Sequence, residues 1–172
     1  MLKTIVLVIA ENQFRDEEYQ IPKDAFERAG FKTITASTTT NIAIGKLGME
    51  VKPDITVDKI DTNTIDALVY VGGGGSEQYF EDELAHRLAR EMVDKDKVLA
   101  AICIAPVILA NAGVLTGKTC TVFPDGAPTL KENGANYTGN LIETDGKIIT
   151  GNGPEAAEGF ANPIINCLNE QP

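Results

Sequence analysis

The chain has no tryptophan, one histidine and only three cysteines among its 172 residues. Cys103, Cys120 and Cys167 form no CxxC pair, and no His or Cys stands near them at the spacing of zinc ligands. This excludes a zinc-finger type of site and a disulfide framework. An odd number of free thiols is typical of a reducing compartment. We therefore expect a cytoplasmic protein that needs no metal and no cofactor.

Long apolar runs and basic clusters are also missing. The longest apolar run, residues 5–10, is far shorter than the ~20 residues that a membrane-spanning helix needs. It is also short for a secretory signal, and only Lys3 precedes it as a positive charge. The 25 acidic and 15 basic residues give a net charge of −10, which disfavours nucleic acid as a partner. We expect neither a nucleic-acid nor a membrane partner.

No internal repeat, low-complexity tract or linker-like stretch divides the chain. With 43% hydrophobic residues, it is long enough to bury one continuous core. We expect one domain over residues 1–172.

Apolar segments of strand type alternate with segments of helical period. Residues 2–10 are almost continuously apolar, which is typical of a central parallel strand covered on both faces. In residues 82–93, three apolar side chains fall four apart on one helix face. The expected strands are 2–10, 31–36, 49–51, 55–57, 66–71, 98–102, 119–122, 141–143 and 148–150, the last two joined as a hairpin. The expected helices are 16–29, 82–93, 106–112, 128–132 and 154–168, with a kink or restart at Pro163.

This alternation predicts an α/β fold with a mainly parallel central sheet and helices on both faces. In such folds the reactive groups gather at the carboxyl ends of the strands. The strand at 98–102 ends directly before Cys103, which is therefore the first candidate for a functional residue.

The segment around Cys103 has the pattern of a nucleophile elbow, a tight turn from a strand into a helix. Small residues, Ala101 and Ala105, stand two positions before and after the cysteine, where a tight turn needs them. Pro106 suits the first turn of the following helix. Such a position can lower a thiol pKa from ~8.5 into the range of roughly 3.5–7.5. The alternative is a buried structural cysteine, which is the interpretation that we favour for Cys120 and Cys167.

The hexapeptide Ala101-Ile102-Cys103-Ile104-Ala105-Pro106 resembles the AIC-x-[AG]-P elbow of the DJ-1/ThiJ/PfpI superfamily. The resemblance extends over nearly the whole chain, and its other elements are Glu18 four residues before Pro22, Arg28-Ala29-Gly30, the strand and glycines of 66–73, and Gly153-Pro154. It implies a flavodoxin-like three-layer sandwich that is usually a homodimer.

In that superfamily a glutamate of the first helix meets the nucleophile, and by position this residue is Glu18. A carboxylate and a thiolate in contact cannot both ionise cheaply, so the pair should titrate as one coupled unit. If Glu18 keeps the proton, it can donate a hydrogen bond to the Cys103 sulfur or to a sulfinate oxygen formed there. The alternative is an exposed acid in the first turn of a helix, favoured by the helix dipole.

Four glycines, Gly72 to Gly75, follow the strand at 66–71. A phosphate-binding loop is excluded because no Gly-Lys-[Ser/Thr] follows and the next segment is acidic. By the resemblance, this turn supplies backbone N–H groups, so Gly73 and Gly74 with Ile104 are candidates for an oxyanion hole beside Cys103. A plain flexible turn is the alternative.

The histidines expected from the resemblance are missing. PfpI-type proteases carry His directly after the cysteine, where this chain has Ile104, and the DJ-1 branch carries His before a later proline, where this chain has Phe123. The single histidine, His86, lies about 200° around its helix from the apolar residue Leu84, so we expect it to be exposed. Peptide hydrolysis needs a group that protonates the departing amine, so peptidase or amidase activity is disfavoured.

Two functions of different class remain. In the first, Cys103 is oxidised by peroxide and Glu18 stabilises the product, so that the protein responds to oxidative stress; oxidation needs no histidine. In the second, a glyoxalase or deglycase, Cys103 adds to a small carbonyl such as methylglyoxal, Glu18 moves the protons, and Gly73, Gly74 and Ile104 hold the oxyanion. From the sequence we favour the first, because both expected histidines are absent.

Overall fold

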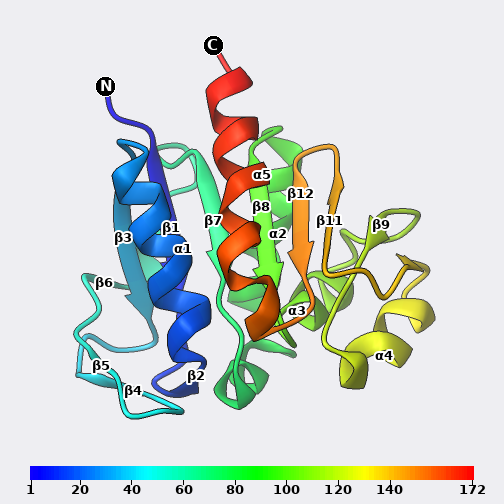
Figure 1. The fold of residues 1–172 in the computed structure, drawn as a ribbon, viewed down its shortest axis with the longest axis horizontal. Helices are drawn as coiled ribbons and strands as arrows, with labels where there is room; N and C mark the ends of the chain where they lie inside the picture. Colours follow the sequence, from blue (N-terminus) through cyan, green and yellow to red (C-terminus); the bar gives the residue numbers. More distant parts are fainter.

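A seven-stranded sheet runs through the middle of the computed structural model, which describes all 172 residues (Figure 1). Its strand order is β11-β12-β8-β7-β1-β3-β6, and all neighbours are parallel except the antiparallel pair β11 and β12. The strands are β1 (Thr4–Val8), β3 (Lys32–Ser37), β6 (Ile55–Thr56), β7 (Ala67–Tyr70), β8 (Val98–Ile102), β11 (Ile142–Asp145) and β12 (Ile148–Gly151).

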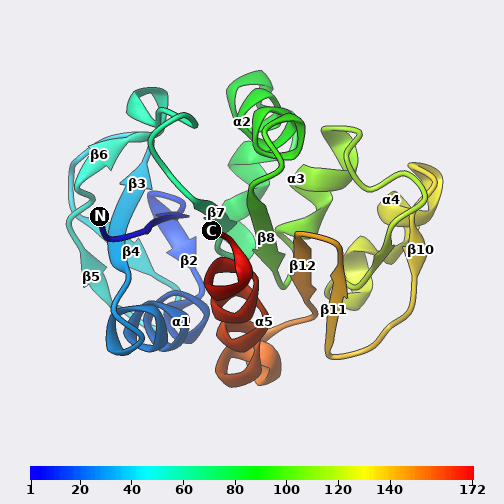
Figure 2. The ribbon, with the colours of Figure 1, turned by 90° about the horizontal axis from the view of Figure 1, so that it is seen from above.

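Helices cover both faces of this sheet, as Figure 2 shows. Helices α1 (Asp16–Arg28) and α5 (Ala157–Glu170) pack together on one face, and α2 (Glu83–Asp94) and α3 (Pro106–Asn111) cover the other. Each face has its own apolar core, one built around Phe26 and Phe160 and the other around Leu88 and Leu109. The central strands β1, β7 and β8 are almost wholly buried and apolar because both of their faces are covered. The predicted three-layer, flavodoxin-like α/β fold is confirmed.

Smaller elements flank this sheet. They are a three-stranded sheet of β2 (Asn12–Phe14), β4 (Ala43–Gly45) and β5 (Glu50–Val51), a parallel pair of β9 (Thr119–Cys120) and β10 (Asn136–Tyr137), helix α4 (Ala127–Glu132), and the 3-10 turns η1 (Val57–Lys59), η2 (Gly74–Tyr79), η3 (Pro124–Gly126) and η4 (Pro154–Ala156). The strands β2, β4 and β10 were not expected from the sequence.

The sequence predicted a kink or a restart at Pro163, and the helix does not restart there. Helix α5 continues through this proline from Ala157 to Glu170. A proline removes one backbone hydrogen bond, but the apolar residues on both sides of it, Phe160, Ile164 and Leu168, remain fully buried against the sheet. Packing of the whole apolar face therefore keeps the helix in one piece.

The predicted exposure of His86 is also wrong. The side chain is buried, and its Nε2 lies 2.7 Å from the carbonyl oxygen of Phe80, which also accepts a hydrogen bond from Asn111. The prediction assumed that only the side of the helix that packs on the sheet is buried. Helix α2 also packs against α3, so a second side of it is covered.

No helix of the protein is both long enough and apolar enough to cross a membrane.

Candidate active site around Cys103

Cys103 stands on the tight turn between β8 and α3, at the carboxyl end of the sheet. Its φ angle of 63° lies in the left-handed region that non-glycine residues rarely adopt. The turn is held in place because the N–H of Cys103 donates to Gly151 O at 2.9 Å and its carbonyl accepts from Phe123 N at 2.7 Å. The flanking Ala101 and Ala105 are fully buried. This is the geometry of a nucleophile elbow.

Glu18 reaches the cysteine from the first turn of α1. Its side chain is fully buried, and neither carboxyl oxygen is paired with an N–H or O–H donor. Gly72 lies against both groups: a Cβ there would be 2.5 Å from the Cβ of Cys103 and 2.6 Å from Oε1 of Glu18. The structure therefore brings Glu18 and Cys103 together beneath Gly72, and the alternative of an exposed acid for Glu18 is wrong.

Burial dominates the protonation of this pair. It raises the pKa of the Glu18 carboxyl to about 8, and the Cys103 thiol and Arg15 act in the opposite direction. Burial also raises the pKa of the Cys103 thiol to about 12; the charge of Glu18 adds to this rise, and the backbone N–H groups of Gly73 and Ile104 oppose it. The lowered thiol pKa expected from the sequence is thus not found, because the sequence argument left out the burial of both groups. Two protons leave the pair in two coupled steps.

The glycine-rich turn supplies one of the two N–H groups at the sulfur, and Ile104 supplies the other. The turn is not a flexible one. A Cβ at Gly73 would lie 2.3 Å from Gln13 O, and a Cβ at Gly75 would lie 1.8 Å from Asn12 O. Glycine is required because this backbone packs directly on β2. Gly74 lines the same pocket.

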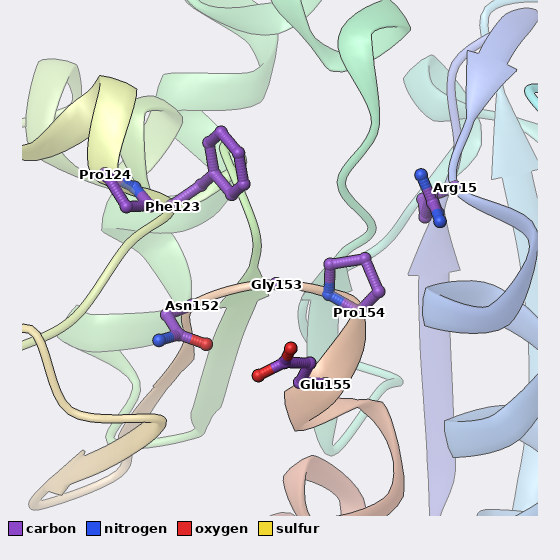
Figure 3. Close-up of a pocket in the computed structure, with 7 residues that line it drawn as sticks. All are labelled: Arg15, Phe123, Pro124, Asn152, Gly153, Pro154 and Glu155. Atoms are coloured by element: carbon purple, nitrogen blue, oxygen red, sulfur yellow. The ribbon is translucent and has the colours of Figure 1, made fainter.

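A pocket of about 300 Å³ opens at Cys103, which keeps 9% of its surface exposed. We call it the Cys103 pocket, and its lining residues are Arg15, Lys46, Gly73, Gly74, Cys103, Ile104, Phe123, Asp125 and Pro154. An adjoining cavity of about 440 Å³ shares Arg15, Phe123 and Pro154 with it. Figure 3 shows this cavity with Phe123 and Pro124 on one side, Arg15 on the other, and the segment Asn152 to Glu155 between them.

Three charged residues of the Cys103 pocket, Arg15, Lys46 and Asp125, were not predicted from the sequence. They come from three separate segments that only the tertiary fold brings together, and no motif marks them. Phe123, the residue at the position of the expected histidine, does line the pocket. The only histidine of the chain, His86, is absent from it.

The other two cysteines lie outside this pocket. Cys120 is fully buried in β9, and Cys167 is half-buried on α5. Nowhere does the structure group three His, Cys, Asp or Glu side chains in a way that would hold a metal ion.

Comparison with known proteins matches this chain and its fold to one family. A model described as the DJ-1/PfpI family matches residues 3–167. A deglycase of Pyrococcus horikoshii is 33% identical over 95% of this chain and 98% of its own length. An uncharacterized protein of Methanocaldococcus jannaschii is 36% identical over 96% of this chain and 82% of its own length.

Solved structures agree with the sequence matches. A ThiJ/PfpI domain protein from Brachyspira murdochii superimposes with a TM-score of 0.97 at 33% identity, covering 99% of both chains. DJ-1beta of Drosophila melanogaster superimposes with a TM-score of 0.90 at 30% identity, covering 99% of this chain and 92% of that one.

Proposed function

The chain belongs to the DJ-1/PfpI family, and from this premise we propose that it is a cysteine-dependent enzyme acting on small carbonyl compounds of the methylglyoxal type. The observation that supports this most directly is the pairing of Cys103 with a buried acid that has no other partner, at the base of an open pocket. The deglycases among the relatives, from Pyrococcus horikoshii and Pyrococcus furiosus, fit the same chemistry.

The size of the pocket supports the carbonyl enzyme over the peroxide sensor. Peroxide needs very little room, whereas a pocket of about 300 Å³ has space for a small organic substrate. Peroxide also reacts with the thiolate, and the raised pKa of Cys103 keeps that form scarce at neutral pH. Carbonyl addition can use the fraction of Glu18 that is ionised near its pKa of about 8, since that carboxylate takes the thiol proton while the sulfur–carbon bond forms.

The proposed reaction balances with one water. The sulfur of Cys103 adds to the aldehyde carbon, and the carbonyl oxygen gains a proton to give a hemithioacetal. Glu18 moves a proton from C1 to C2, and the hydroxyl proton passes from the oxygen on C1 to the oxygen on C2. This oxidises C1, reduces C2 and leaves a thioester. Water hydrolyses this thioester and releases lactate and the free thiol. The N–H groups of Gly73 and Ile104, which face the sulfur, are in position to stabilise the oxyanion.

A pKa near 8 suits Glu18 for this role. A group that both takes and returns a proton works best when its pKa is close to the ambient pH, and burial brings the carboxyl into that range. Amide hydrolysis has no comparable support. No histidine lines the pocket to protonate a departing amine.

Peroxide sensing is the second candidate, and one observation favours it. Protonated Glu18 has no other acceptor nearby, so it is free to donate a hydrogen bond to an oxygen placed on the Cys103 sulfur. In this case Cys103 is oxidised to a sulfenate and then a sulfinate while peroxide is reduced to water.

One set of variants tests both candidates. We expect wild type to convert methylglyoxal into lactate, Cys103→Ala to lose this activity, and Glu18→Gln to lose it by about 10²–10⁴-fold. Cys167→Ala, which removes a thiol outside the pocket, should behave as wild type. Absence of lactate from wild type would overturn the enzyme proposal. A stable gain of two oxygens on Cys103 under dilute peroxide, without lactate formation, would favour the sensor.

A homodimer, expected from the family resemblance, belongs to the same proposal. Light scattering coupled to size-exclusion chromatography should give twice the chain mass of 18.4 kDa.

A further inference from the structure

We infer that Arg15 and Lys46 form an anion subsite in the Cys103 pocket, so that the preferred substrates are 2-oxoaldehydes that also carry a carboxylate or phosphate group. The reacting group of the substrate in this inference rests on the proposed function. The anion subsite itself can be tested without any turnover.

The two positive side chains of the pocket are opposite in sign to the net charge of the protein. The chain carries a net charge of −10, yet the Cys103 pocket is lined by two positive side chains and one negative side chain, Asp125. A local positive field in a negatively charged protein concentrates anions at one place on its surface. Because Arg15 and Lys46 line the same pocket as Cys103, the anions that they attract are brought close to the thiol.

The backbone turn that carries Lys46 is fixed in place by a buried carboxylate. Asp16, which is 7% exposed, accepts hydrogen bonds from the N–H groups of Leu47 at 3.0 Å and Met49 at 2.9 Å. The N–H of Lys46 itself donates to Phe14 O at 2.8 Å. Gly45 is needed beside this carboxylate, because a Cβ there would lie 2.2 Å from Asp16 Oδ1. The turn that carries Lys46 is therefore held rigidly over β2.

Arg15 is the residue directly before Asp16, and its guanidinium has N–H donors that no other side chain uses. Its backbone N–H donates to Gly72 O at 2.9 Å, which ties it to the turn above Cys103. The hydrogen bond and the ion pair of its guanidinium are both to Glu17, whose Oε1 lies 2.8 Å from Nε and 2.7 Å from Nη2. An arginine has five N–H donors in a planar fork that matches a carboxylate or a phosphate. Several of these donors remain free for a ligand.

A suitable probe substrate combines the reacting carbonyl groups of methylglyoxal with an anionic group. 4,5-Dioxopentanoate has the same adjacent aldehyde and ketone as methylglyoxal and a carboxylate at its other end. By the proposed reaction it takes up one water to give 2-hydroxyglutarate and releases one proton, with the thioester formed and hydrolysed on Cys103 as before. A 2-oxoaldehyde bearing a phosphate would present the same anionic chemistry to Arg15 and Lys46.

Alkylation of Cys103 tests the subsite directly. The Cys103 sulfur displaces iodide from a CH2 group in both iodoacetate and iodoacetamide. Of the two reagents, only iodoacetate is charged. We expect the rate ratio of iodoacetate to iodoacetamide to be at least fivefold higher for Cys103 than for the neutral thiol 2-mercaptoethanol. One unit charge about 4 Å away in water has roughly this effect. Because both reagents attack one sulfur, any change in its pKa cancels from the ratio.

Matched variants assign the effect to the two cations. Lys46→Gln and Arg15→Gln should each lower the ratio by roughly fivefold, Lys46→Arg should restore it, and Asp125→Asn should raise it. Lys32→Gln is the control, since it removes the same charge at the amino end of β3, outside the pocket. The excess should also fall as salt is raised from 0.01 M to 0.5 M. A ratio equal to that of 2-mercaptoethanol, or a ratio unchanged in Lys46→Gln, would overturn the inference.

Turnover separates this inference from the proposed function. We expect kcat/KM for 4,5-dioxopentanoate to exceed that for methylglyoxal in wild type, and the excess to be lost in Lys46→Gln. Turnover of methylglyoxal with no preference for anionic reagents would overturn the subsite alone. An anion preference in alkylation without turnover of either substrate would overturn the proposed function and leave the subsite intact.

Discussion

Replacement of Glu18 by glutamine should change how the stability of the protein depends on pH. Burial raises the pKa of Glu18 from 4.5 to about 8 in the folded protein, so the folded state holds this proton more tightly than the unfolded state. The stabilisation is complete below pH 4.5 and is lost as the pH rises towards 8. The shift of 3.5 units corresponds to about 5 kcal/mol at 1.36 kcal/mol per unit, and about 3.5 kcal/mol of it falls between pH 5 and pH 8. Water does not screen this charge, because the Glu18 side chain is fully buried.

The neutral glutamine cannot ionise, so the variant lacks this loss. We expect the free energy of unfolding of Glu18→Gln, measured in urea, to rise relative to wild type by about 3.5 kcal/mol from pH 5 to pH 8. Glu27→Gln is the matched control on the same helix, because hydrogen bonds from Lys23 and Thr33 lower the pKa of Glu27, so that it stays ionised from pH 5 to pH 8. The control should stay flat relative to wild type over this range. A difference between Glu18→Gln and wild type that changes by less than about 1 kcal/mol over this range would refute the assigned burial of the charge.

Substitutions at four further positions probe the same region. Gly72→Ala puts a methyl group 2.5 Å from the Cβ of Cys103; it should lower the free energy of unfolding by about 3 kcal/mol and slow alkylation of the thiol. Gly74→Ala, with nothing within 4 Å, should stay within about 0.5 kcal/mol of wild type in the same urea titrations. Cys103→Gly should be more stable than Cys103→Ala by about 1 kcal/mol, because only glycine adopts a φ of 63° without strain; equal stability would contradict this. Asp16→Ala should lower the free energy of unfolding by about 1.5–3 kcal/mol and, by releasing the turn of Lys46, reduce the preference of the thiol for iodoacetate.

The layered fold follows from the sequence because the local and the global signals agree. Strands such as β1 and β8 are apolar on both faces, and only a parallel sheet between two helix layers buries both. The hairpin of β11 and β12 was equally clear from its turn residues. The short strands β2 and β4 have no such pattern. Their pairing depends on Asp16 and on the glycine-rich turn that packs against β2, and neither contact is encoded locally.

The parts of the site that a local motif or the family resemblance marks were predictable from the sequence. Cys103 was found from the small residues and the proline of its elbow, and Glu18 from its family position. The burial of the pair was not predictable, because it depends on the close approach of Gly72 from another strand end. For this reason the expected direction of the thiol pKa was wrong. Arg15 and Lys46 likewise became neighbours only through the fold of β2 against β4.

Cys103 and Glu18 are both energetically unfavourable, and they lie in contact with each other. Finding both in one place argues for a functional role over a packing role. Cys103 occupies a left-handed backbone conformation that costs a non-glycine residue about 1–2 kcal/mol. Glu18 holds a carboxyl group in the core with no N–H or O–H donor to compensate it. An apolar or glycine residue at either position would relieve the cost without disturbing the sheet. What the two residues provide together, and neither provides alone, is a proton held between a carboxyl and a thiol at the base of an open pocket. The proposed carbonyl addition uses that arrangement, so a functional role explains the unfavourable energies of both residues better than packing does.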